Sequence, residues 1–243
     1  MLHKWLGNPA PWHGHYYCAL ALFLSGLLQI SLMRFAHQDS TAGASICTIA
    51  VFAYLVKTHQ SVTAMINAGF LFVWGCCVIV RGIPAPPETF LSPSTCEVLT
   101  SKAIWTWMLS APTVFAVAMD LSELPERVST LGVALCLFAI STDLLEKNTT
   151  QGKFCRNPYA FCSISMCWGL FFLHPTSWTI SFPLIFTYIV LFAPGGYRTA
   201  EMSRRSRMLK DPLLMEYVRT TSPFIPLPAG VYERLPKCAE LFK

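Results

Sequence analysis

The chain has 243 residues, of which 53% are hydrophobic and 13% are charged, and its mean hydropathy is +0.47. A water-soluble domain of this size cannot bury that much apolar surface, so the composition predicts an all-α, polytopic membrane helix bundle. The formal net charge of +5 belongs to the segments between the apolar runs, because an Asp, Lys or Arg in hydrocarbon costs about 2.5–3.5 kcal/mol. The sequence has no basic stretch interleaved with aromatic residues, which excludes nucleic acid as a partner and favours membrane lipids.

Seven apolar runs follow one another along the chain and predict about six or seven transmembrane helices. They cover residues 16–35, 44–56, 62–80, 103–119, 128–145, 158–173 and 178–192. The second run is short, which favours a tilted or partly interfacial helix. Pro112 predicts a kink in the fourth run, because neighbouring helices can satisfy the carbonyl groups that a proline leaves without a donor. We expect one transmembrane domain over residues 1–243, without an internal repeat.

Two stretches lie outside the apolar runs. Residues 83–101 contain four prolines, which lack backbone donors and break helices, so we predict an extra-membrane loop there. The basic tail, residues 197–236, contains the sequence DPLLMEYVRTTSPFIPLP. Its composition alone favours an amphipathic interfacial helix followed by an extended, proline-rich strap outside the membrane. The Lys and Arg residues at the ends of the runs favour an orientation with the amino terminus outside and this tail inside.

The ten cysteines do not indicate a metal site or a disulfide scaffold. Most of them lie within apolar runs, where a cysteine behaves as a small hydrophobic residue. No Cys-x-x-Cys pair is present, and the histidine spacing does not indicate zinc. The sequence also lacks a glycine-rich phosphate loop and a nucleophile elbow. We therefore predict no metal ligand.

Residues 155–169 read CRNPYAFCSISMCWG. They resemble the signature of the steroid 5α-reductase-like C-terminal family of membrane reductases, relatives of the sterol reductases and the isoprenylcysteine methyltransferases. In that family an Arg-His-Pro-Asn-Tyr run, a Gly-Glu pair and a Trp-Gly pair open a membrane helix and bind the nucleotide cofactor. The residues that fit the signature are Arg156, Pro158, Phe161, Trp168 and Gly169. The tail also resembles the end of this family through Glu216, Tyr217, residues 219–226 and Tyr232, so the resemblance covers residues 134–236.

Five signature positions carry a different side chain. They are Asn157, Tyr159, Ala160, Cys162 and Ser163, where the family has His, Asn, Tyr, Gly and Glu. A hydrogen bond to a charged group is worth about 1.5–3 kcal/mol, so the loss of three would cost on the order of 5 kcal/mol. Micromolar binding, about −8.2 kcal/mol, would then become millimolar or weaker. We therefore assign no catalytic residue.

The resemblance still implies a vestigial cofactor-binding set. In this set Arg156 would bind a phosphate, Asp143 would accept a hydrogen bond from a ribose, and Tyr217 and Arg219 would line the cavity. The protein's part in such a reductase is to bind, orient and surround the cofactor. With this set intact, the cofactor would be NADPH; with the signature altered as it is, we expect none.

These features predict a non-catalytic, reductase-like integral membrane protein that serves as a structural or accessory subunit of a larger membrane complex. Its partners would be membrane lipids and other membrane-protein subunits. The expected location is an organelle membrane, the mitochondrial inner membrane with a respiratory complex or, alternatively, the endoplasmic reticulum. The alternative function is an NADPH-dependent oxidoreductase that reduces a lipid or sterol double bond, and a third is a lipid or nucleotide sensor without turnover.

Overall fold

The computed structural model describes residues 38–57, 62–82, 106–114, 129–146, 155–173, 175, 180–192, 197–198, 201–202, 212–227 and 229–232. These residues form helices, short connections and one isolated parallel bridge between Cys155 and Ser222. The prediction of an all-α chain is confirmed for them. Among the helices in these ranges, none is both long enough and apolar enough to cross a membrane.

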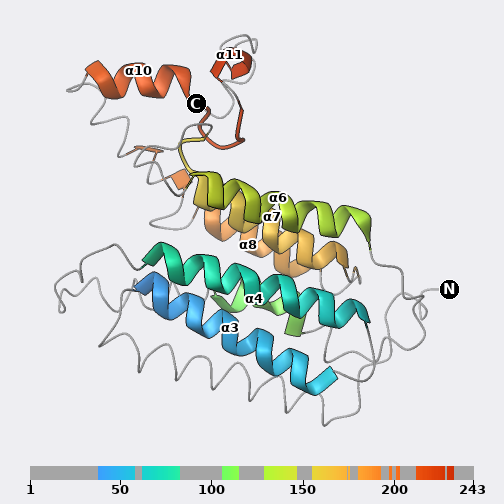
Figure 1. Ribbon diagram of the computed structural model, residues 1–243. Helices are drawn as coiled ribbons and strands as arrows, with labels where there is room; N and C mark the ends of the chain where they lie inside the picture. Colours follow the sequence, from blue (N-terminus) through green and yellow to red (C-terminus); the bar gives the residue numbers. More distant parts are fainter. Residues whose placement is uncertain are drawn as a thin grey trace. The chain divides into compact units, whose positions relative to one another are not determined.

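The helices follow the predicted runs closely (Figure 1). They are α3 (Gln38–Lys57), α4 (Val62–Gly82), α6 (Thr130–Glu146), α7 (Pro158–Leu173), α8 (Ser181–Phe192), α10 (Pro212–Thr220) and α11 (Ala229–Tyr232). A further helical segment, residues 106–114, continues through the predicted kink position Pro112. The predicted run 16–35 and the predicted loop 83–101 lie outside the described residues.

Local sequence signals explain where two of these helices start. Ser129 caps α6, because its hydroxyl oxygen accepts a hydrogen bond from the backbone N–H of Gly132 at 3.3 Å. α7 begins at Pro158, whose fixed φ suits a first helical turn and whose missing N–H leaves nothing unsatisfied there. Asn157 precedes it, and its carbonyl oxygen accepts a hydrogen bond from the N–H of Phe161 at 3.3 Å.

The chain forms two compact units. Unit 1 comprises Met1–Leu137 and Met166–Phe186, and unit 2 comprises Phe138–Ser165 and Thr187–Lys243. Each of α6, α7 and α8 contributes residues to both units. The expectation of a single transmembrane domain stays a prediction.

In unit 1, α3 and α4 cross at two glycines. A Cβ atom on Gly75 would lie 2.6 Å from Sγ of Cys47 and 3.0 Å from its backbone nitrogen. A Cβ atom on Gly43 would lie 2.7 Å from the carbonyl oxygen of Gly75. The two backbones are therefore in contact, which requires residues without a Cβ atom at the crossing.

The same crossing recurs in unit 1 between α6 and α7. A Cβ atom on Gly169 would lie 2.6 Å from Sγ of Cys136, and one on Gly132 would lie 2.8 Å from the nitrogen of Leu173. In each pair the first helix carries Gly-x-x-x-Cys and the second carries Trp-Gly at the contact. The two crossings share this short motif, and the expectation of a chain without an internal repeat stays a prediction.

A buried amide connects three helical segments of unit 1. Asn67 on α4 donates a hydrogen bond from Nδ2 to the carbonyl oxygen of Leu170 on α7 at 3.1 Å. Its Oδ1 accepts a hydrogen bond from the hydroxyl group of Thr113. Asn67 and Thr113 are both buried, so their polar groups have no access to water. The hydrogen bond between the two side chains gives each of them a partner.

Candidate functional site

The start of the reductase-like signature pairs with the strap, which we define as residues 221–227 directly after α10. Cys155 and Ser222 form the parallel bridge, and the backbone N–H of Arg156 donates to the carbonyl oxygen of Ser222 at 2.8 Å. The thiol of Cys155 donates to the carbonyl oxygen of Phe224 at 2.8 Å. All of these residues belong to unit 2, so the signature and the strap form one local structure.

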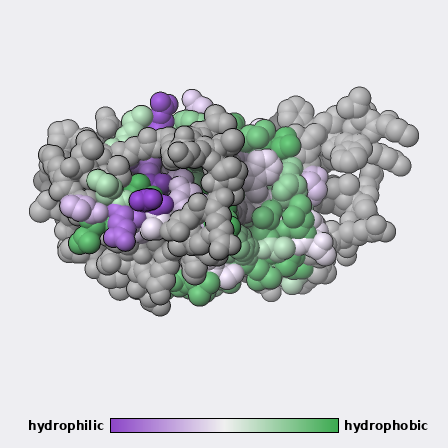
Figure 2. All heavy atoms as spheres, turned by 90° about the horizontal axis from the view of Figure 1, so that it is seen from above, coloured by the Kyte–Doolittle hydropathy of each residue, from purple (hydrophilic) through white to green (hydrophobic). Residues whose placement is uncertain are grey.

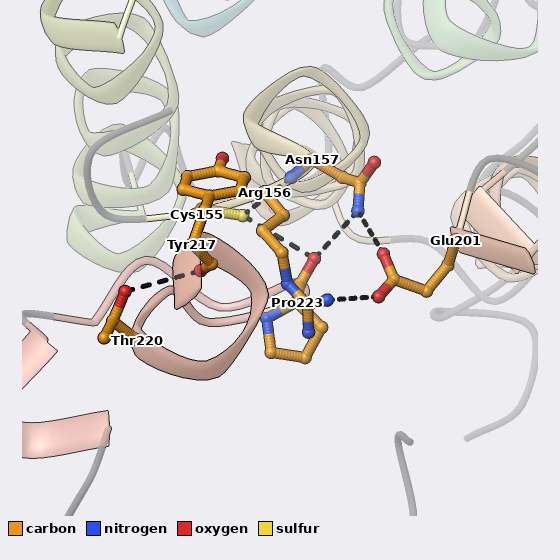
Figure 3. A network of polar contacts seen from close by, with 7 residues as sticks. All are labelled: Cys155, Arg156, Asn157, Glu201, Tyr217, Thr220 and Pro223. Atoms are coloured by element: carbon orange, nitrogen blue, oxygen red, sulfur yellow. Dashed lines mark hydrogen bonds and ion pairs between the residues drawn. The ribbon is translucent and has the colours of Figure 1, made fainter. Parts of the chain in front are cut away.

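The side chain of Arg156 is held by an acidic residue from the tail. Its Nη1 forms an ion pair and hydrogen bond with Oε1 of Glu201 (Figure 3). The two side chains keep only 4% and 6% of their accessible surface. A phosphate group would have to displace a buried carboxylate to reach this guanidinium.

Asn157 connects the same carboxylate to the strap. Its Nδ2 donates to the carbonyl oxygen of Pro223 at 2.9 Å and, more weakly, to Oε2 of Glu201 at 3.5 Å. A side-chain amide has two N–H donors, so one nitrogen can serve both acceptors. We call Cys155, Arg156, Asn157, Glu201, Ser222 and Pro223 the latch, because their contacts hold the strap against the residues that precede α7.

An aromatic cluster lies next to the latch. The ring of Phe224, from the strap, makes edge-to-face contacts with Phe161 at a centroid distance of 5.6 Å and with Tyr197 at 5.4 Å. Phe161 also contacts Phe138 of α6 in the same geometry at 5.9 Å. Such pairs each add about 0.5–1.5 kcal/mol beyond the burial of their surface. The latch is therefore supported by apolar packing as well as by polar contacts.

The predicted cofactor-binding residues are placed differently from one another. Arg156 is in the latch, and Asp143 is buried near the end of α6 in the same unit. Tyr217 is half-buried on α10, where its backbone carbonyl oxygen accepts hydrogen bonds from Thr220 and from the N–H of Thr221. Arg219 is exposed in the last turn of α10. Arg156 lies against the strap, which follows Tyr217 and Arg219 in the sequence. Its side chain forms an ion pair within the chain.

Ser163, which stands where the family has a glutamate, is also engaged within the chain. It is fully buried, and its hydroxyl group donates to the carbonyl oxygen of Tyr159 one turn earlier in α7 at 2.6 Å. A serine that bonds its own helix in this way has used its donor. This side chain therefore does not replace the acid that a reductase would need.

Sequence reasoning identified Arg156 but missed its partner, and it treated Asn157 only as a loss of chemistry. Glu201 is the signal that could have been used, because it is an isolated acidic residue within the basic sequence YRTAEMSRRSR. Within the part of the chain that the structure describes, no group of three or more His, Cys, Asp or Glu side chains could hold a metal ion. What this site can do chemically is hold the strap by charge-assisted hydrogen bonds.

We compared the chain with known proteins, and no protein-family model, no curated protein and no solved structure matches it. The resemblance to the steroid 5α-reductase-like family stays a prediction that rests on the residues of the signature and the tail.

Proposed function

We propose that this chain is a non-catalytic, reductase-like integral membrane protein that serves as a structural or accessory subunit of a larger membrane complex. The observation that carries the proposal is the buried ion pair between Arg156 and Glu201. The cation that a reductase would offer to a phosphate is neutralised inside the chain, and it is desolvated together with its partner. In this proposal the first residues of the signature, Cys155, Arg156 and Asn157, hold the strap, and the signature binds no cofactor and contains no catalytic residue.

The apolar surface supports a place in a membrane and beside other subunits. In unit 2, large apolar side chains on α6 and α8 are about half exposed or more, among them Leu144, Leu145, Tyr188 and Phe192. In unit 1 the same holds for Leu131 and Leu137 on α6 and for Leu184 and Ile185 on α8. Figure 2 shows hydrophobic side chains gathered over part of the described surface. Such surfaces are stable against lipid or a protein partner and costly in water.

We extend the proposal to a polytopic helix bundle in an organelle membrane, the mitochondrial inner membrane before the endoplasmic reticulum. The latch fixes the strap, where Ile225 is 53% exposed, and the strap directly follows α10, where Leu213 is 78% exposed. A fixed, partly apolar strap suits contact with another membrane-protein subunit. The alternative, an NADPH-dependent reductase of a lipid or sterol double bond, would have to rely on Arg219 for the phosphates.

The test is to purify the full-length chain from its native membrane in a mild detergent and to measure particle mass and NADPH oxidation together. We expect a particle larger than one chain, with partner chains in a fixed ratio, and no NADPH oxidation with sterol or lipid enones. Glu201→Gln should shift the chain toward smaller particles, whereas Glu216→Gln, an exposed glutamate on α10, should not. A monomeric particle that oxidises NADPH would overturn the proposal.

A further inference from the structure

We propose that Cys47 and Cys76 are an oxidation site, at which a peroxide converts two thiols into an intramolecular disulfide that joins α3 to α4. The inference is independent of the proposed function and rests on unit 1. The two Sγ atoms lie 3.9 Å apart, close to the sum of two sulfur radii. Both residues are half-buried, and neither belongs to a disulfide in the structure.

The glycine crossing explains why the two sulfur atoms meet. Cys47 is one of the α3 residues that a Cβ atom on Gly75 would meet, and Cys76 follows Gly75 in α4. Because the backbones are in contact at this point, the cysteines project from helix segments that cannot move apart without breaking the crossing. The Cys47 thiol also lies 3.6 Å from the carbonyl oxygen of Phe72, so its position is defined from two sides.

The contact between the two sulfur atoms is the geometric starting point for a disulfide. A disulfide needs sulfur atoms about 2.05 Å apart and Cβ atoms about 3.5–4.5 Å apart. The Sγ atoms of Cys47 and Cys76, 3.9 Å apart, must approach by about 1.9 Å to reach that bonding distance.

The second crossing supplies a comparison inside the same chain. Cys136 at the α6–α7 crossing and Cys167, two residues before Gly169, are both fully buried. Cys136 occupies the position at its crossing that Cys47 occupies at the first. The oxidant must reach one sulfur atom before a disulfide can form, so we expect the half-buried pair to react and the buried pair to stay reduced.

The oxidation balances with a peroxide as the two-electron oxidant. The first thiol loses its proton, its sulfur attacks one peroxide oxygen, and the O–O bond breaks; the leaving hydroxide takes up that proton, so a sulfenic acid and one water form. The second thiol then attacks the sulfenic sulfur, the S–O bond breaks, and a second water leaves as the S–S bond forms. Two thiols lose two electrons in total, and hydrogen peroxide is reduced to two molecules of water.

The experiment treats the full-length chain in detergent with hydrogen peroxide, blocks the remaining thiols with N-ethylmaleimide under denaturing conditions, and maps the cross-linked peptides by mass spectrometry. We expect a Cys47–Cys76 cross-link that dithiothreitol reverses, with Cys136 and Cys167 alkylated. Cys76→Ser should abolish the cross-link, and Cys77→Ser, which changes the neighbouring half-buried cysteine, should keep it. Mixing two tagged forms of the chain tests whether the bond lies within one molecule.

Three results would overturn the inference. The first is alkylation of both Cys47 and Cys76 after peroxide treatment that oxidises added glutathione completely. The second is a cross-link that survives in Cys76→Ser, because α3 would then have another partner. The third is a bond found only between the two tagged forms. Cys76→Ala serves as a second variant, so that a folding defect of the serine variant cannot be read as loss of the cross-link.

Discussion

Arg156 and Glu201 form a buried ion pair although they lie 45 positions apart in the sequence. Arg156 lies two residues before the start of α7. Glu201 lies in the tail, beyond the end of α8. Asn157 donates to the same carboxylate and to Pro223 in the strap. The pair therefore fixes how the tail folds back within unit 2, and the latch depends on it.

Breaking this pair on one side should destabilise unit 2 strongly. Removal of one partner from a buried ion pair leaves an uncompensated charge and typically costs about 3–5 kcal/mol. We expect Glu201→Gln and Arg156→Met each to lower the thermal unfolding midpoint of the full chain in detergent and to expose the tail to trypsin.

The double variant Arg156→Met, Glu201→Gln is the informative control for these two single variants. With both charges removed, no uncompensated charge is left in the site, and the cost should be clearly smaller than the sum of the two single costs. Additive losses would show that the two side chains do not act on each other. Glu216→Gln, on the exposed side of α10, should leave the midpoint unchanged.

Asn157 should be sensitive to a change that keeps its shape. In Asn157→Asp two donors become acceptors that face the Pro223 carbonyl oxygen and the Glu201 carboxylate. Each unsatisfied buried group costs about 1–3 kcal/mol, and like charges add to this cost. We expect faster proteolysis of the tail than in Asn157→Ala, which removes the donors without adding a charge. Equal rates for the two variants would contradict this assignment.

Much of the helical structure could be predicted because apolar runs and helix-boundary residues are local signals. α7 begins and ends where predicted, since Pro158 favours a first turn and Pro175 disfavours its continuation. α3 begins at Gln38 and not at residue 44, because a helix can continue through the polar residues before an apolar run. The glycine crossings were missed, because a glycine in one helix reveals a contact only when its partner helix is known.

Only one part of the candidate site, Arg156, could be predicted from the sequence. Arg156 stood out through the resemblance, but nothing local connects it to Glu201, which the fold brings from a distant segment. The altered position Asn157 was interpreted as lost chemistry, whereas its amide is a donor in the latch. A single sequence shows which side chains have changed, and only the fold shows what the new side chains contact.

Because of the glycine crossing between α3 and α4, substitution of two different glycines in α4 should have clearly different effects on stability. In Gly75→Ala the new methyl group would lie 2.6 Å from Sγ and 3.0 Å from the nitrogen of Cys47. Such overpacking typically costs about 1–3 kcal/mol, so we expect a lower unfolding midpoint. Gly69→Ala is the matched control, because a Cβ atom there has no neighbour within 4 Å. That variant should be neutral or more stable by up to about 1 kcal/mol, since alanine favours helix over glycine.

The buried amide of unit 1 allows a second test by paired substitution. Asn67→Leu removes the acceptor of the Thr113 hydroxyl group and the donor to the Leu170 carbonyl oxygen. Leaving such groups unsatisfied costs about 1–3 kcal/mol each, so this variant should unfold at a clearly lower temperature. Adding Thr113→Val removes one of the two unsatisfied groups and should recover part of the loss. A double variant less stable than Asn67→Leu would contradict the hydrogen bond between the two side chains.

The central claim is that the reductase-like signature binds the strap and not a nucleotide. The most direct measurement is calorimetric titration of the detergent-purified full chain with NADPH, with Arg156→Ala and Arg219→Ala as the matched pair of buried and exposed arginine variants. We predict no binding heat up to millimolar NADPH for the natural chain and for both variants. Micromolar binding that Arg156→Ala abolishes and Arg219→Ala retains would contradict this account and would make Arg156 a phosphate ligand.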